Sequence, residues 1–239
     1  MSLKSMEGCK LLDFYPLGDA AVVIRVGSEI NIANHRTVMA LVSYLEDHPF
    51  PGMVECVPSF TTVTAFYDVM QITYDEVIAQ FKGLEDQIVT GTDESSKTVE
   101  IPVCYGGEFG PDLEAVARHN HLTPDEVIAI HTGADYLVYM IGFAPGFPYI
   151  GGMSEKIATP RLPSPRLAIP PGTVGIAGAQ TGVYPIETPG GWRLIGRTPL
   201  ALFRPKEHPP TLLRAGDHVR FYAITEDEYQ LMLEEFSRN

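Results

Sequence analysis

Two C-terminal segments carry the side chains best suited to hold an anionic ligand. Arg161 and Arg166 lie in PRLPSPR, where prolines restrict the backbone, and Arg197 ends the segment GAQTGVYPIETPGGWRLIGR, residues 178–197. Arginine binds carboxylates and phosphates through a planar fork of N–H donors. We therefore expect one or more of these arginines to bind substrate or phosphate. The alternative is that they pair with carboxylates on the surface.

Proton transfer needs an acid or a base, and Glu187 and His131 are the catalytic candidates. Glu187 belongs to the same 178–197 segment. His131 is expected at the end of a helix, where the helix dipole alone favours a histidine. For His131, a structural role and a role in proton transfer therefore both remain open.

The 178–197 segment also contains residues that could line a small-molecule pocket. Gln180 and Tyr184 can donate and accept hydrogen bonds for a substrate or phosphate, and Trp192 is the only tryptophan of the chain. Trp192 is either a pocket wall or a core anchor. Pro189-Gly190-Gly191 predicts a turn between two antiparallel strands.

The stretch IGFAPGFPYIGG, residues 141–152, carries four glycines and two prolines but no charge. It is therefore unsuited to supply an acid, a base or an ionic contact through its side chains. Phe143, Phe147 and Tyr149 are expected to give the pocket its shape, as a floor beneath the two reactive segments.

Familiar catalytic and cofactor motifs are absent from the sequence. It contains no GxxxxGK[ST], GxGxxG, HExxH or GxSxG pattern. The seven histidines are scattered, so we expect no metal site on this chain. The loop CYGGEFGPD, residues 104–112, either binds an anion through backbone N–H groups or only turns the chain into a helix.

Composition excludes further classes of function. The net charge of −13 argues against nucleic-acid binding, which needs a concentrated basic face. No apolar run approaches the roughly 18 residues that span a membrane, and the N-terminus lacks a signal-peptide core. Cys9, Cys56 and Cys104 are too widely spaced for a disulfide framework, which fits a cytoplasmic protein.

The elements that must position these residues indicate an α+β chain of two domains. In the first, residues 9–92, strands are predicted at 20–26, 53–57 and 61–67, and helices at 29–46 and after a capping box that starts at Thr73. With a closing strand, this order is the ferredoxin-like pattern. The polar segment GTDESSK, residues 91–97, is the predicted linker.

The second predicted domain covers residues 98–239. A strand at 98–103, a short helix after Pro111, a helix that a capping box starts at Thr123, and a strand at 135–143 are followed by short apolar runs between Gly/Pro turns. This pattern predicts a compact β barrel or sandwich, with the proline-dense segment 159–171 crossing it. Residues 226–236 predict an acidic C-terminal helix.

The motifs GFAPGFPYIGG and PRLPSPRLAIPPGTVGIAGAQTGVYPIETPGGWRLIGRTP resemble the B-subunit family of prokaryotic 5-oxoprolinase, also known as KipI and formerly labelled allophanate hydrolase subunit 1. YGGEFGPDL and HTGADYLVYMIGF extend the resemblance upstream. The resemblance implies a cyclophilin-like β-barrel after a smaller α/β domain. It also implies a heteromeric complex, in which an A subunit and a KipA-like C subunit act with this protein to open 5-oxoproline to L-glutamate, using ATP.

That implied reaction suits the residue types. A lactam is a poor electrophile, and transfer of phosphate to its oxygen would create a leaving group; cations would hold the phosphate and the substrate carboxylate, and a base would deliver water. Because a nucleotide loop is missing, we expect ATP to be bound by or shared with partner subunits, and the chain to act only in a complex. No biotin-attachment triplet M-K-M is present, so any biotin would belong to a partner.

The resemblance leaves two alternatives open. One is a KipI-type inhibitor that binds a sporulation histidine kinase. The other is a carboxyltransferase-like component of a urea or amide carboxylase system, since the same pair of domains recurs there.

Overall fold

The computed structural model describes residues 12–81 and 96–238. The chain divides into two compact units, Met1–Glu94 and Ser95–Asn239, and each is described by itself. The predicted domain limits, 9–92 and 98–239, stay a prediction, because most of the segment between them lies outside the described residues.

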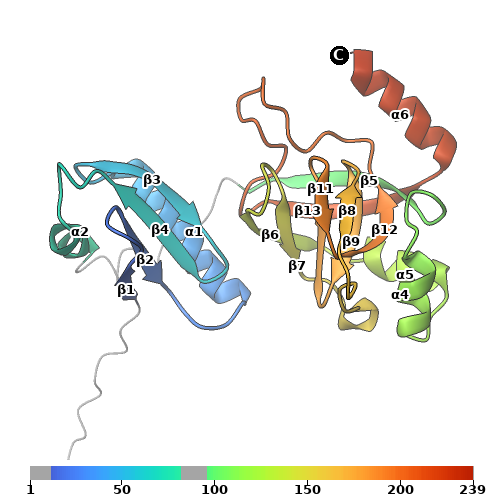
Figure 1. Cartoon of the computed structure of the whole chain (residues 1–239), viewed down its shortest axis with the longest axis horizontal. Helices are drawn as coiled ribbons and strands as arrows, with labels where there is room; N and C mark the ends of the chain where they lie inside the picture. The colour runs from blue at the N-terminus through green and yellow to red at the C-terminus, as the bar shows by residue number, and fades with distance from the viewer. Residues whose placement is uncertain (1–11, 82–95, 239) are drawn as a thin grey trace, which may run out of the picture. The chain divides into compact units, whose positions relative to one another are not determined.

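Over residues 12–81, the N-terminal unit consists of one antiparallel sheet and two helices (Figure 1). Its elements are β1 (Asp13–Pro16), β2 (Ala21–Arg25), α1 (Ile32–Asp47), β3 (Met53–Pro58), β4 (Thr62–Tyr67) and α2 (Tyr74–Phe81). The strand order is β1-β2-β4-β3, and α1 lies along one face of the sheet. Apolar side chains of α1, β2 and β4 form the core between helix and sheet.

Strand β1 was missed from the sequence. It is four residues long, mostly exposed and ends in Pro16, so it lacks the apolar alternation that marks a strand. It pairs with β2 and takes the sheet edge that a closing strand of the ferredoxin-like pattern would need. The predicted closing strand itself lies outside the described residues. The order strand, helix, strand, strand, helix over residues 21–81 is confirmed.

The C-terminal unit is built around a closed barrel of seven strands in the order β10-β7-β6-β13-β5-β12-β9. Its strands are β5 (Thr98–Tyr105), β6 (Tyr136–Ile141), β7 (Pro148–Gly151), β8 (Arg166–Ile169), β9 (Thr173–Ala177), β10 (Gln180–Val183), β11 (Thr188–Gly190), β12 (Arg193–Arg197) and β13 (His218–Ile224). Its helices are α4 (Leu113–His119), α5 (Pro124–Thr132), the short 3-10 helix η1 (Glu155–Ile157) and α6 (Glu226–Arg238). The predicted barrel is confirmed, and α4 and α5 pack together against it.

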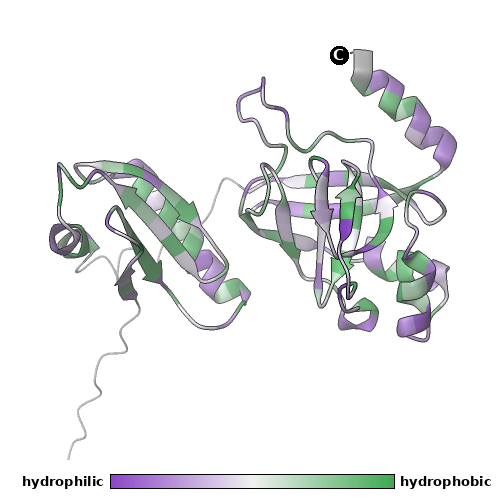
Figure 2. Ribbon diagram, viewed as in Figure 1, coloured by the Kyte–Doolittle hydropathy of each residue, from purple (hydrophilic) through white to green (hydrophobic). Residues whose placement is uncertain are grey.

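Alternation along the barrel strands separates an inner face from an outer face. In β9, Val174 and Ile176 belong to the barrel core, whereas Gly175 and Ala177 face outward toward a second apolar cluster. Figure 2 shows hydrophobic residues concentrated on the barrel strands, while α6 is largely hydrophilic. Because both faces of β9 are covered, all five of its residues are buried.

Two expectations for the proline-rich region were wrong. The segment 159–171 does not cross the barrel: its strand β8 pairs with β11 in a separate two-stranded sheet. Thr188–Gly190 is strand β11 rather than part of a turn, because Gly190 pairs with Arg166 there. Strands β8 and β11 form a two-stranded ribbon, and Ile169 of β8 packs on the barrel cluster that contains Tyr184 and Trp192. These contacts outweighed the turn propensity of Pro189-Gly190-Gly191.

The loop before α4 is pressed against β12. The Gly110 N–H donates to Gly106 O, and the Asp112 N–H donates to Leu194 O at 2.8 Å. A Cβ at Gly110 would overlap the Ile195 carbonyl. Glycine is therefore required at this position by a backbone contact and not by a positive φ.

We predict that Gly110→Ala will lower the free energy of unfolding by about 3 kcal/mol or more, because the barrel backbone cannot yield to the added methyl group. Gly107→Ala is the control: Gly107 has φ +52° and nothing within 4 Å of an added Cβ, so only strain of about 1–2 kcal/mol is expected. Denaturant unfolding of the purified chain measures both. Equal losses of unfolding free energy in the two variants would contradict the close contact between Gly110 and the Ile195 carbonyl.

Candidate functional site

Four aromatic side chains gather on the outer face of the barrel. The outer aromatic cluster consists of Phe147, Tyr149, Tyr184 and Trp192, which lie at or beside the ends of β7, β10 and β12. Phe147 is at its centre, with ring centroids 5.1 Å from Tyr149, 5.3 Å from Tyr184 and 5.5 Å from Trp192. All three pairs meet edge to face, the arrangement that the quadrupoles of aromatic rings favour.

Strand glycines make room for the outer aromatic cluster. A Cβ at Gly175 would lie 3.1 Å from the Trp192 Cβ, and one at Gly182 would lie 3.1 Å from the Trp192 ring and 3.2 Å from Phe147. Glycine in a strand interior is usually unfavourable, but here it lets the rings approach the backbone. Of the five aromatic residues predicted for the pocket, Phe147, Tyr149, Tyr184 and Trp192 thus lie together, although Phe147 and Tyr184 are core residues, 1% exposed each.

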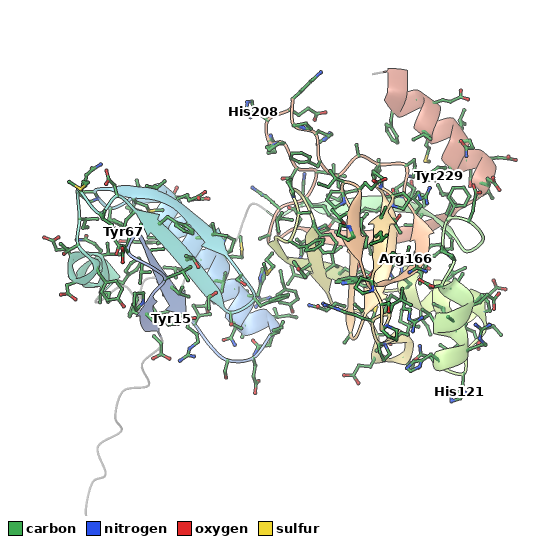
Figure 3. The ribbon with its side chains drawn as sticks, viewed as in Figure 1. Tyr15, Tyr67, His121, Arg166, His208 and Tyr229 are labelled. Carbon is green, nitrogen blue, oxygen red and sulfur yellow. The ribbon has the colours of Figure 1, made fainter. Side chains whose placement is uncertain are left out.

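Arg161 and Arg166 both lie beside this cluster. The exposed guanidinium of Arg161 is 6.0 Å from the ring centroid of Trp192, a cation–π distance. Arg166, labelled in Figure 3, pairs with Asp112 at 2.9 Å. Its Nη1 atom is buried and has no hydrogen-bond partner among the described residues.

Tyr184 belongs to the outer aromatic cluster, and its hydroxyl is close enough to Arg161 and Arg166 to be influenced by their charges. Burial raises the pKa of its hydroxyl to about 12, against the opposing influence of Arg161 and Arg166. The Trp192 backbone N–H donates a hydrogen bond to this oxygen. At neutral pH Tyr184 is therefore an uncharged phenol that can still donate its own proton.

Asp112 was not singled out from the sequence, yet it holds Arg166 in place. One carboxylate oxygen accepts from Arg166 and the other accepts from the Leu194 N–H at 2.8 Å. The residue precedes α4, so the sequence suggested only a helix start. Its partners are 54 and 82 residues away, and no local pattern indicates them.

The remaining candidates on this side of the barrel are less buried. Glu187 is exposed in the connection between β10 and β11. Gln180 begins β10, and by alternation it faces outward like Gly182. Phe143 is 62% exposed at φ +70° and meets Phe147 edge to face at 5.4 Å. Holding a bulky residue at positive φ and exposing its ring to water both cost free energy. Because strained residues of this kind cluster at binding sites, Phe143 is a candidate contact residue.

His131 lies on the other side of the barrel wall. It is fully buried, its Nδ1 is 2.7 Å from the Tyr105 hydroxyl, and its Nε2 is 3.0 Å from Thr181 Oγ1. Thr181 donates its own proton to Gly175 O, so it accepts from the Nε2–H of His131. Burial lowers the pKa of His131 to about 3, so the ring is neutral at neutral pH and its Nδ1 accepts from the Tyr105 hydroxyl.

Since Thr181 faces inward and Gly182 outward, strand β10 separates His131 from the outer aromatic cluster. This geometry favours a structural role for His131, with both ring nitrogens satisfied, over proton transfer to a ligand at the cluster.

Arg197 is also separated from Arg161 and Arg166. Its guanidinium is 5.9 Å from the ring centroid of Phe109, and it hydrogen-bonds the Tyr229 side chain at the base of α6. Arg197 thus contacts the C-terminal helix and not the outer aromatic cluster.

A hollow of about 360 Å³ lies in the N-terminal unit, and none of its lining residues is one predicted for the site. It is lined by Pro16, Gly18, Asp19, Tyr67, Val69, Ile72, Thr73 and Tyr74. Across residues 12–81 and 96–238, no three side chains of His, Cys, Asp or Glu gather where they could hold a metal ion. In the same residues, no helix is both long and apolar enough to cross a membrane.

The burial of His131 predicts a pH dependence of stability. The unfolded chain binds a proton near pH 6.5 and the folded chain only near pH 3, so the unfolded state gains protons first as pH falls. Between about pH 6 and pH 4, the stability of the unaltered chain should fall more steeply than that of His131→Gln, by about 1.4 kcal/mol per pH unit. Denaturant unfolding at each pH measures the slopes.

His119→Gln, at an exposed position of α4, is the control for that experiment and should keep the slope of the unaltered chain. A His131→Gln slope that equals the slope of the unaltered chain would show that His131 takes up its proton in the folded state.

Comparisons with known proteins agree on one family. The family model described as Carboxyltransferase domain, subdomain C and D, matches residues 12–213. The protein named as the B subunit of 5-oxoprolinase in Bacillus subtilis (strain 168) is 55% identical over 229 residues, 92% of this chain and 95% of that protein. Its namesake in Escherichia coli O157:H7 is 41% identical over 208 residues, 87% of this chain and 94% of that protein.

A solved structure is also similar to most of this chain. The crystal structure of TTHA0988 superimposes with a TM-score of 0.76 at 35% identity and covers 85% of this chain, which spans 40% of that longer protein. Because the family model and the two bacterial relatives each span most of the chain, this protein belongs to the 5-oxoprolinase B-subunit family.

Proposed function

We propose that this chain is part of an ATP-dependent 5-oxoprolinase complex, which opens 5-oxoproline to L-glutamate together with an A subunit and a KipA-like C subunit. The observation that carries the proposal is the 55% identity with the B subunit of a 5-oxoprolinase across nearly the whole of both proteins. That relative is named as one subunit of an enzyme, and we therefore propose that further subunits act with this chain.

The outer aromatic cluster and its two arginines are the proposed substrate contact. 5-Oxoproline is a small ring that bears one carboxylate, and the exposed guanidinium of Arg161 above Trp192 combines a cation with an apolar ring face. The buried Nη1 of Arg166 offers a second donor at the same cluster. Asp112 fixes the orientation of Arg166, so the donor is already in place before a ligand arrives.

Proton transfer is assigned to Glu187 in this proposal. Its carboxylate is exposed and makes no ion pair within the described part of the chain, so it is available to accept a proton from water. Phe143 and Tyr149 supply shape, and Gln180 and Tyr184 supply neutral hydrogen-bonding groups.

The glycine-rich loop 104–112 does not fit a triphosphate. The N–H groups of Gly106, Gly110 and Asp112 in this loop already donate to backbone carbonyls. The Asp112 carboxylate at the start of α4 would also repel phosphate. We therefore derive no step through ATP on this chain and assign its binding to partner subunits.

Reconstitution tests the proposal. The purified chain and the A and C subunits of the same organism are mixed with ATP and 5-oxoproline, and glutamate release is followed. We expect activity with all three proteins and a loss of at least about tenfold when this chain is omitted. Undiminished glutamate release without this chain would overturn the proposal.

A second experiment tests the substrate contact. In the reconstituted complex, Arg161→Ala should lower kcat/KM for 5-oxoproline by about 10- to 100-fold, because a hydrogen-bonded charge pair with the carboxylate is lost. Arg161→Lys should recover only part of it, since a fork is replaced by a point charge. Arg118→Ala, at an exposed arginine of α4, is the matched control. Equal kcat/KM for Arg161→Ala and Arg118→Ala would remove Arg161 from the site.

A further inference from the structure

The C-terminal helix α6 is anchored to the barrel through its first turn. Tyr229, labelled in Figure 3, is 7% exposed. Its ring packs on Phe109 with centroids 4.8 Å apart, and Arg197 hydrogen-bonds its side chain. The main contact of the helix is with β5, and beyond Tyr229 it extends away from the barrel (Figure 1).

An apolar stripe continues along α6 past this anchor. The stripe consists of Tyr229, Met232, Leu233 and Phe236, at the spacing i, i+3, i+4 and i+7 that places side chains on one face of a helix. Exposure rises along it: Met232 is partly exposed, Leu233 is 40% exposed and Phe236 is 48% exposed. A stripe of this kind at the surface is typical of a helix that docks into a groove.

Acidic side chains surround the stripe. At 100° per residue, Glu228 and Glu235 flank it on the side of Met232, and Glu226 flanks it on the side of Leu233. A second copy of the chain is a poor partner for this face, because it would place carboxylates against carboxylates in a chain of net charge −13. The complementary partner offers an apolar groove with a rim of lysine and arginine.

The first turn of α6 is stabilised by a cap within this chain. The Thr225 N–H and hydroxyl bond the Glu228 carboxylate at 2.7 and 2.9 Å, and the Thr225 oxygen accepts from the Glu228 N–H at 3.3 Å. This reciprocal cap stabilises the first turn. Because α6 is already helical, docking would cost less conformational entropy than folding a disordered tail.

We infer that the α6 stripe is a docking surface within the complex, which inserts Leu233 and Phe236 into a basic-rimmed apolar groove of a neighbouring protein. The inference rests on the proposed function, since the neighbour is another component of that complex. It adds a location for the contact: the part of α6 that follows Tyr229, toward the C-terminal end of the helix.

Binding of the full-length chain to the A and C subunits of the same organism, by titration calorimetry, tests the inference. The double variant Leu233→Ser/Phe236→Ser should bind at least tenfold more weakly than the unaltered chain, because buried apolar anchors dominate such interfaces. Leu231→Ser is the matched control: Leu231 is 60% exposed on the opposite face of the same helix and should leave binding unchanged. Circular dichroism confirms that both variants keep their helix.

Salt and charge give a second measurement. Raising NaCl from about 0.05 M to about 0.5 M should weaken binding, and Glu235→Lys should slow association and reduce the salt dependence. Equal affinity of the double variant and the unaltered chain, or an equal loss for Leu231→Ser, would overturn the inference while leaving the proposed function intact. Self-association through α6, seen by sedimentation, would overturn it too. If the unaltered chain bound neither the A subunit nor the C subunit, the proposed function would be overturned, and the docking inference with it.

Discussion

The packing of Trp192 over two strand glycines organises the outer face of the C-terminal barrel. Gly175 and Gly182 have no side chains, so the indole reaches the backbone of β9 and β10. Phe147, Tyr184 and Ile169 then close around it, which fixes the ribbon of β8 and β11 against the barrel. Any larger residue at either glycine would displace the indole, and with it the surface over which Arg161 lies.

The barrel wall divides polar chemistry into two compartments. Inside, His131, Tyr105 and Thr181 satisfy one another in a dry environment, so they stabilise one packing arrangement and do not exchange protons with a ligand outside. Outside, Arg166 and Asp112 pair beside the outer aromatic cluster, and the Arg166 side chain is partly exposed. A strand only one residue thick separates the two, because successive side chains of β10 point to opposite faces.

The two ends of β12 lead to different parts of the molecule. Trp192, just before its start, belongs to the outer aromatic cluster, and Leu194 packs with that cluster, whereas Arg197 at its end contacts Phe109 and Tyr229. The same strand therefore supports the proposed substrate surface and the anchor of α6. Because Arg197 joins Tyr229 to the end of β12, a substitution at Tyr229 would disturb the end of β12 before it disturbed the outer aromatic cluster.

The sequence alone determined the capped helix starts at Thr73 and Thr123, and it predicted the barrel strands β5, β6, β9, β12 and β13 but not β7 or β10. Capping boxes at Thr123 and Thr73 are local, since donor and acceptor lie three residues apart. Tertiary structure alone decided which polar residues meet. Asp112 reaches Arg166 across 54 residues, and His131 and Arg197 leave the predicted site because their neighbours are set by barrel closure. Strand β1 and the β8–β11 ribbon were likewise decided by pairing partners, and pairing between distant segments leaves no local signal.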